Sequence, residues 1–144
     1  MRGNLRDGRL EDVTERLGAP VTDPRAGRGS AFGDYDNDGD LDVLVNNVND
    51  TPDLYRLDNH CGHHWLMLWL IGTRSNRSAI GARVRSTAGR VTQVEEGRGG
   101  GSYISQNELR VHFGLGGAAR VERLEVRWPN GSWRSGATSR PTAS

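Results

Sequence analysis

Residues 32–45 read FGDYDNDGDLDVLV, which gathers five aspartates into nine positions before the chain turns apolar. The aspartates alternate with other residues, and a single glycine, Gly39, lies among them. Carboxylates this close together repel one another, so the loop that carries them needs a positively charged partner to be stable. A bound cation is therefore the first hypothesis for this stretch, and an ordinary Asp-rich turn is the alternative.

Calcium is the cation that this spacing favours. It takes six to eight oxygen ligands, and a D-x-D-x-D-G loop supplies them from alternate positions. The aspartates at 34, 36 and 38 take positions one, three and five, and Gly39 takes the sharp turn at position six. The predicted ligands are Asp34, Asp36, Asp38, Asp40 through its backbone carbonyl, and Asp42 directly or through water.

The flanking residues predict a strand on each side of this loop. RGSAF (28–32) enters it as a short strand of small residues, and LDVLV (41–45) leaves it as a buried strand. Position twelve is Val45, whereas the helix–loop–helix calcium motif has a bidentate glutamate there. The sequence therefore predicts a strand–loop–strand calcium site.

The rest of the chain also predicts strands and turns, and hence an all-β fold. Residues 81–96 read as two alternating strands about Ala88-Gly89, and residues 109–114 and 121–128 read as further strands. Only residues 11–18 resemble a short helix, and residues 51–63 read as a connector. The longest apolar run, 65–71, is far shorter than the ~20 residues of a membrane span, so we expect none.

The sequence becomes more apolar from HWLMLWLIG (64–72) onward, and we place a domain boundary near Asn59. We expect a calcium-loop region over 1–58, a small sheet or sandwich-like domain over 59–134, and a disordered tail over 135–144. Leu124, Val126 and Trp128, together with Trp65 and Trp69, should form the core of the second domain. Asn130-Gly131 is a strong hairpin signal, but little apolar sequence follows it to form a second strand.

Charge is distributed unevenly between the two halves. Residues 34–58 hold eight aspartates and one arginine, a net charge of −7, and residues 74–140 hold twelve arginines and five acids, a net charge of +7. The basic half would attract a heparin-like polyanion. The alternative is that these arginines lie on the solvent faces of strands, which is ordinary for mixed charge.

The aspartate stretch, in GSAFGDYDNDGDLDVLVNN, resembles the FG-GAP/VCBS repeat, one blade of a calcium-binding β-propeller. NLRDGRLEDVTERLG resembles the segment between two such repeats. The second half is similar to the ASPIC/UnbV domain through HHWLMLWLIGTRSNRSAIGARV, GRGGGSYISQNELRVHFGLG and VERLEVRWPNG. The resemblance implies a partial propeller followed by a small β domain, as in ASPIC-like secreted proteins, although one repeat cannot close a propeller.

Three functions follow as hypotheses. The first, which the family resemblance implies, is a non-catalytic, calcium-stabilised module for extracellular recognition or cell adhesion. Its partner would be a protein or polysaccharide, with no nucleic-acid partner expected. The second is an accessory or catalytic domain acting on a carbohydrate or a secondary metabolite, which would need a concave pocket in the basic half. The third is a fragment without independent activity, with further propeller repeats in a longer native chain.

Other candidate sites carry weaker signals. His60, Cys61, His63 and His64 lie within five residues and offer zinc-binding side chains, but four ligands this close can hardly surround one ion tetrahedrally. Glu108 and His112 are also close in sequence. An acid–base role for that pair would need a cleft and a bound substrate, and a sheet position is the expected place for His112.

Overall fold

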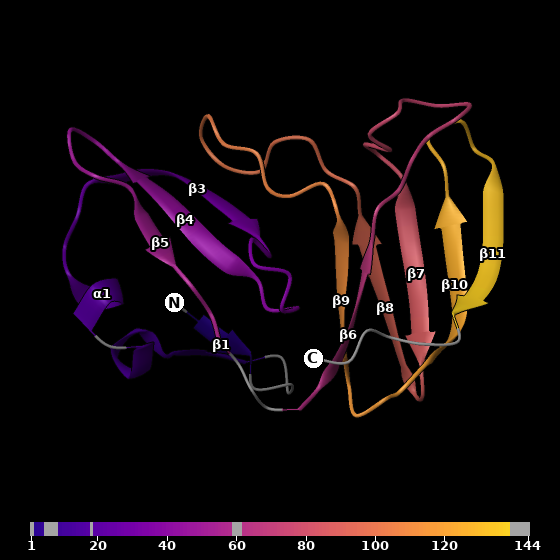
Figure 1. Ribbon diagram of the computed structural model, residues 1–144, viewed down its shortest axis with the longest axis horizontal. Coiled ribbons are helices and arrows are strands. Elements are labelled where there is room, and N and C mark those ends of the chain that lie inside the picture. The colour runs from indigo at the N-terminus through magenta and orange to yellow at the C-terminus, as the bar shows by residue number, and fades with distance from the viewer. Residues whose placement is uncertain (1, 5–8, 18, 59–61, 139–144) are drawn as a thin grey trace.

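The computed structural model describes residues 2–4, 9–17, 19–58 and 62–138 of the 144-residue chain. Within these ranges the protein is almost entirely β, with several small antiparallel sheets (Figure 1), which confirms the predicted all-β class. The described residues form no closed barrel or propeller. Their two helices are single short turns, and neither has the length and apolar character needed to cross a bilayer.

Eleven strands are present in the described part of the chain. They are β1 (Arg2–Asn4), β2 (Leu10–Asp12), β3 (Gly27–Gly33), β4 (Asp42–Asn47), β5 (Asp53–Tyr55), β6 (His64–Leu68), β7 (Arg83–Ala88), β8 (Val91–Glu96), β9 (Val111–Gly116), β10 (Val121–Arg127) and β11 (Trp133–Thr138).

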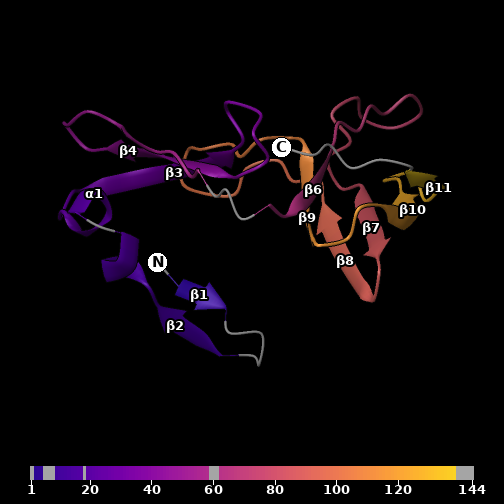
Figure 2. The ribbon, with the colours of Figure 1, turned by 60° about the horizontal axis from the view of Figure 1, so that its bottom comes forward.

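An N-terminal hairpin precedes the main sheets. β1 pairs with β2, and Figure 2 shows this hairpin standing apart from the other strands. A 3-10 helix, η1 (Thr14–Leu17), and a short helix, α1 (Ala19–Thr22), follow it. Asp12 caps the first turn, because its Oδ1 accepts a hydrogen bond from the backbone N–H of Thr14 at 3.0 Å. The helical signal over 11–18 is thus confirmed only in part, because Thr14–Leu17 form a 3-10 helix whereas Glu11 and Asp12 belong to β2.

The aspartate loop connects two strands of a three-stranded antiparallel sheet in the order β3-β4-β5. Gly33 pairs with Asp42 at the ends of β3 and β4, so the chain between them forms the loop. This confirms the predicted strands on both sides. The stretch predicted as a connector, 51–63, instead contains β5, which adds a third strand beside β4.

The second half contains two further sheets that share one apolar core. β6 pairs with β9, and the other sheet has the order β11-β10-β7-β8. Their apolar sides form one core, which includes Phe113 and Leu66 from the first pair and Val84 and Val121 from the four-stranded sheet. Phe113, Val84 and Val121 are at most 1% exposed. Figure 1 shows the β6-β9 pair beside β7 and β8 of the four-stranded sheet, and β8 contacts β9.

Two expectations about the second half are wrong. Trp69 is not in the core, because it follows β6 and is 76% exposed. The predicted disordered tail, 135–144, begins too early: residues 135–138 belong to β11, which pairs with β10 across the Asn130-Gly131 turn. Residues 139–144 lie outside the described residues. Trp128 does pack against the core, although it is only half-buried.

Candidate metal centre

The backbone of the aspartate loop turns sharply at two residues. Asn37 and Gly39 have φ angles of 63° and 96°, in the left-handed region that glycine tolerates best. At Gly39 the lack of a side chain matters a second time, since a Cβ atom there would overlap the indole ring of Trp65. Gly39 thus permits the turn and the close approach of β6 to the loop.

The loop's own N–H groups donate to its carboxylates and hold them in place. Asp34 accepts from the N–H groups of Asp38 at 3.1 Å and Gly39 at 3.0 Å, one on each oxygen. Asp42 accepts from Tyr35 at 3.1 Å and, on its other oxygen, from Leu57 at 2.9 Å. Asp34 and Asp42 are 2% and 3% exposed, so both are carboxylates whose burial is offset by backbone hydrogen bonds.

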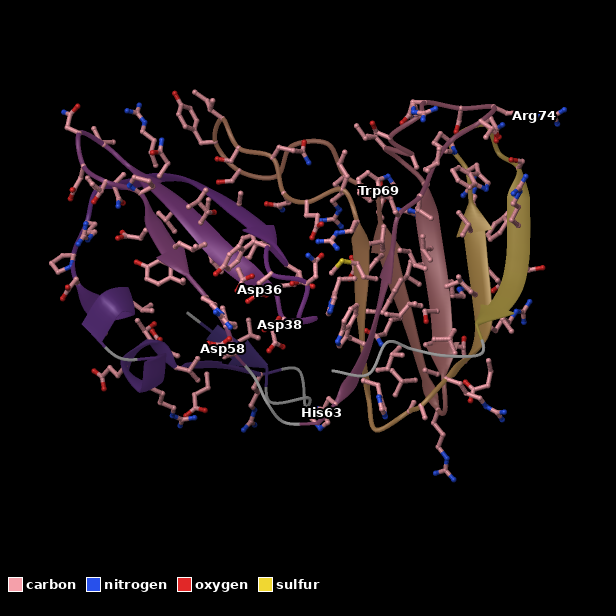
Figure 3. The ribbon with its side chains drawn as sticks, viewed as in Figure 1. Asp36, Asp38, Asp58, His63, Trp69 and Arg74 are labelled. Carbon is pink, nitrogen blue, oxygen red and sulfur yellow. The ribbon has the colours of Figure 1, made fainter. Side chains whose placement is uncertain are left out.

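Two groups of three carboxylates converge on this loop, and Asp36 belongs to both. Ligand atoms of Asp34, Asp36 and Asp42 lie within 4.8 Å of one another, and so do those of Asp36, Asp38 and Asp58. Figure 3 shows Asp36, Asp38 and Asp58 side by side. Of the predicted ligands, the structure therefore brings together Asp34, Asp36 and Asp42 in one group, and Asp36 and Asp38 in the other.

Asp40 and Asp58 both lie outside the set of side chains that the sequence predicted as ligands. The Asp40 side chain is in neither carboxylate group, which leaves its backbone carbonyl as the atom predicted to bind. Asp58 was not predicted at all. It reaches the loop because β5 runs back along β4 and carries the chain past Asp36. The signal that would have found it is β5 itself, since a third strand returns the following residues to the loop.

The electrostatics of the loop centre on Asp36. Loss of hydration raises the pKa of its carboxyl above the ordinary value, and the negative charges of Asp38 and Asp42 act in the same direction. Arg56 opposes this shift: its Nε lies 3.0 Å from Asp36 Oδ2, and its NH2 lies 2.6 Å from Asp58 Oδ1. The other oxygen of Asp36, Oδ1, is buried and has no hydrogen-bond partner in the described structure.

These residues fit a hard cation in charge and in chemistry. Carboxylate oxygens are the ligands that calcium prefers, and each can accept a backbone hydrogen bond while keeping a lone pair for a metal. Asp36, whose Oδ1 has no hydrogen-bond partner in the described structure, belongs to both carboxylate groups. A cation there would partner this oxygen and neutralise the repulsion that Arg56 offsets in part.

The second half of the chain holds the aspartate loop from the other side. Arg110 donates through NH2 to the Asp34 carbonyl and through NH1 to Asn37 Oδ1, both at 2.7 Å. Glu108, which also pairs with Arg110, accepts from the N–H of Asp34 at 3.1 Å. The loop and the segment entering β9 are therefore one hydrogen-bonded unit.

An aromatic pair completes this contact. His112 Nε2 lies 2.8 Å from the Gly39 carbonyl oxygen, and its ring stacks on Trp65 with the centroids 6.4 Å apart. Trp65 Nε1 is buried and has no hydrogen-bond partner in the described structure. Trp65 was predicted as a core residue of the second sheet, but the structure places it against the aspartate loop. Glu108 and His112 likewise serve to dock this loop.

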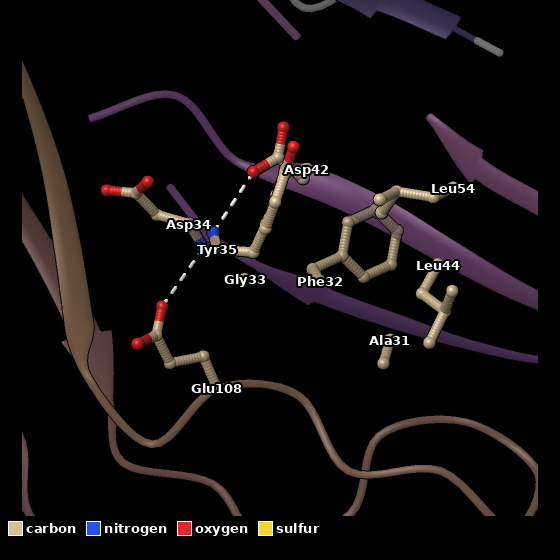
Figure 4. A pocket seen from close by; sticks show the side chains of 9 residues that line it. All are labelled: Ala31, Phe32, Gly33, Asp34, Tyr35, Asp42, Leu44, Leu54 and Glu108. Atoms are coloured by element: carbon tan, nitrogen blue, oxygen red, sulfur yellow. Dashed lines mark hydrogen bonds between the residues drawn. The ribbon is translucent and has the colours of Figure 1, made fainter. Parts of the chain in front are cut away.

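A hollow of about 450 Å³ adjoins the loop on the face of the β3-β4-β5 sheet (Figure 4). Phe32, Leu44 and Leu54 form its apolar side, and Asp34, Asp42 and Glu108 lie at its polar end. Each of these three carboxylates accepts a backbone hydrogen bond. The pocket thus lies beside the acidic loop, whereas the enzyme hypothesis required one in the basic half.

The weak zinc candidate, His60, Cys61, His63 and His64, falls partly on residues that the structure does not describe. His60 and Cys61 lie outside the described residues. Of the other two candidates, His63 is exposed and His64 begins β6 with a half-buried side chain. The structure therefore does not test the weak zinc signal at these four residues.

A comparison with known protein families found a match in the second half of the chain. Residues 72–140 match the family described as ASPIC and UnbV, which confirms the predicted resemblance for this part of the chain. The match covers β7 to β11 and thus includes the strands of the four-stranded sheet. No curated protein matches the chain.

Proposed function

We propose that the chain is a non-catalytic recognition module that a structural calcium ion in the aspartate loop stabilises. The observation that carries this proposal is the convergence of two carboxylate groups on Asp36, whose buried Oδ1 has no partner among the described residues. The ion would be held by Asp34, Asp36, Asp38, Asp42 and the Asp40 carbonyl, with Asp58 as a further carboxylate. Bound calcium would link β3, β4 and the end of β5.

The expected affinity for calcium indicates the compartment in which the site would be occupied. Without a bidentate glutamate at position twelve, calcium should bind with a Kd of about 10⁻⁴–10⁻³ M, the range of extracellular modules. An extracellular or secreted location would keep such a site largely occupied. The resemblance of residues 1–58 to an FG-GAP/VCBS repeat supports the same location, and it also supports a role in adhesion to a protein or polysaccharide.

The enzyme alternative has one observation in its favour, which is the 450 Å³ pocket beside Asp34 and Glu108. A domain acting on a carbohydrate or secondary metabolite would use such a pocket to bind its substrate. The backbone hydrogen bonds to Asp34, Asp42 and Glu108 favour a structural role for these carboxylates instead. Hydrolysis or transfer by the purified chain, lost on Glu108→Gln, would favour the enzyme.

Calorimetric titration of the full chain with calcium tests the proposal. We expect one site of the stated affinity and poor competition by magnesium, which demands tighter octahedral geometry. At 10–100 times its Kd, calcium should add about 1.4–2.7 kcal/mol to the free energy of unfolding. Asp36→Ala should abolish this gain, and Asp23→Ala, which removes an exposed aspartate outside the loop, should leave it intact.

In a chelator, Asp36→Ala should not lower the stability of the protein. Because the folded-state pKa of Asp36 is raised, its charged form costs stability above that pKa. Removing the carboxyl should then leave the calcium-free protein at least as stable as the wild type near neutral pH. No heat and no shift in melting temperature at several times the expected Kd would mean that the aspartates form only a solvated turn.

A further inference from the structure

The outward face of the β11-β10-β7-β8 sheet concentrates arginines. Val84, Ser86 and Ala88 of β7 are buried, so the alternation of a strand turns Arg83 and Arg85 to the opposite face, where both are exposed. The register continues this face onto the next strand. Arg127 lies opposite Arg83, Glu125 opposite Arg85, and Arg123 opposite Thr87.

The positive charge of this face is only partly neutralised. Arg83 pairs with Glu96 at 3.1 Å, and Arg123 pairs with Glu125 at 2.8 Å. Within the described part of the chain, Arg85 and Arg127 have no carboxylate partner. Like charges directly opposite one another destabilise a sheet, so the Arg83–Arg127 neighbours carry a cost that a bound anion would remove.

An aromatic ring and a hollow lie next to the unpaired charge. Trp133 of β11 is 62% exposed and lies opposite Arg127, whose guanidinium carbon is 6.0 Å from the centre of the indole ring. At the end of the same strand pair, a hollow of about 170 Å³ is lined by Gly81, Arg83, Arg127, Trp128 and Pro129. A cationic rim beside flat aromatic surface fits a ligand that has both an anionic group and a ring.

We propose that this face binds an acidic polysaccharide. Carboxylate or sulfate groups of the glycan would bind Arg85 and Arg127, and a sugar ring would pack on Trp133. Glu96 and Glu125 on the same face favour a glycan over a nucleic acid, because they accept hydrogen bonds from sugar hydroxyls but repel a continuous phosphate backbone. The proposal names a partner class for the recognition role above, and it requires no calcium.

The test uses the full chain in a chelator and dilute buffer, so that calcium plays no part. Binding is measured to immobilised hyaluronan, which offers carboxylates, to dextran sulfate, which offers sulfates, to neutral dextran and to poly(dT). We expect binding to one or both acidic glycans and none to dextran. Binding should weaken as salt rises, because screening acts over ~10 Å at 0.1 M salt.

Paired variants make the test specific to the face. Arg85→Gln with Arg127→Gln should weaken glycan binding about tenfold or more, since charge-assisted hydrogen bonds are lost. Trp133→Ser should weaken it as well, with the melting temperature checked in each case. Arg74→Gln with Arg90→Gln removes the same charge from loops off this face and should leave binding close to the wild type (Figure 3 shows Arg74 pointing outward).

Three results would overturn the proposal. They are no binding to either acidic glycan in dilute buffer, equal weakening by the two double variants, and tighter binding to poly(dT) than to the glycans. A normal calcium titration together with no glycan binding would reject this inference and leave the calcium-stabilised module standing. The converse result would reject the calcium site alone.

Discussion

At the scale of single residues, Gly39 links the aspartate loop to the rest of the molecule. Its φ of 96° sets the turn, and its missing side chain leaves room for Trp65. These two demands are separable, because Gly89 at the β7–β8 turn has a positive φ of 58° but open space where a Cβ atom would lie. A comparison of the two glycines therefore isolates the contact with Trp65.

We predict that Gly39→Ala destabilises the protein more than Gly89→Ala does. Both changes force a residue with a Cβ atom into the left-handed region, at a cost of about 1–2 kcal/mol. At Gly39 the overlap with the Trp65 indole should add about 1–3 kcal/mol, as in an overpacked core. Denaturant unfolding of both variants measures the difference. Equal losses of stability would show that Trp65 does not pack on the loop as described.

At the scale of elements, alternation and turn signals were enough to predict most strands. β3, β4, β7, β8, β9 and β10 all coincide with predicted segments. β5 escaped prediction because it has only three residues and follows Pro52. β11 escaped because WRSGAT has little apolar character, and pairing with β10 through the Asn130-Gly131 turn is what makes it a strand.

Local sequence patterns likewise revealed only part of the candidate site. The ligands within the loop follow from the spacing of the aspartates, whereas Asp58 depends on the unpredicted β5. Trp65 looked like a core residue because it opens an apolar run. Its actual neighbours, Gly39 and His112, are set by how β6 and β9 meet the loop, and a local pattern contains no such information.

The contact between β6 and the loop predicts a spectroscopic signal. The indole of Trp65 lies against Gly39 in a half-buried site. Calcium binding to the loop would alter the surroundings of this ring, and it should therefore change the fluorescence of Trp65. The change should be lost in Trp65→Phe, which keeps an aromatic ring beside His112. It should persist in Trp69→Phe, since Trp69 is 76% exposed and outside the core. Loss of the signal in Trp69→Phe alone would contradict this assignment.

At the scale of the whole molecule, the two halves are joined along β3 as well as at the loop. Ser30 and Phe32 donate their N–H groups to Ser102 Oγ and Asn107 Oδ1, at 3.2 and 3.1 Å. The Phe32 carbonyl accepts from the N–H of Glu108 at 2.8 Å. The segment from Ser102 to Glu108 thus satisfies backbone groups at the outer edge of β3, which would otherwise be bare.

These contacts predict that calcium in the first half stabilises the second. We expect calcium to slow amide hydrogen exchange over 109–116, which includes the buried Phe113, as well as over 27–58. Arg110→Ala should reduce the effect on 109–116, because Arg110 bonds to both Asp34 and Asn37. Arg120→Ala, at an exposed arginine with a 3.8 Å contact to Glu122, is the control and should leave the effect unchanged. Calcium protection confined to 27–58 in the wild type would mean that the halves unfold independently, despite the hydrogen bonds between them.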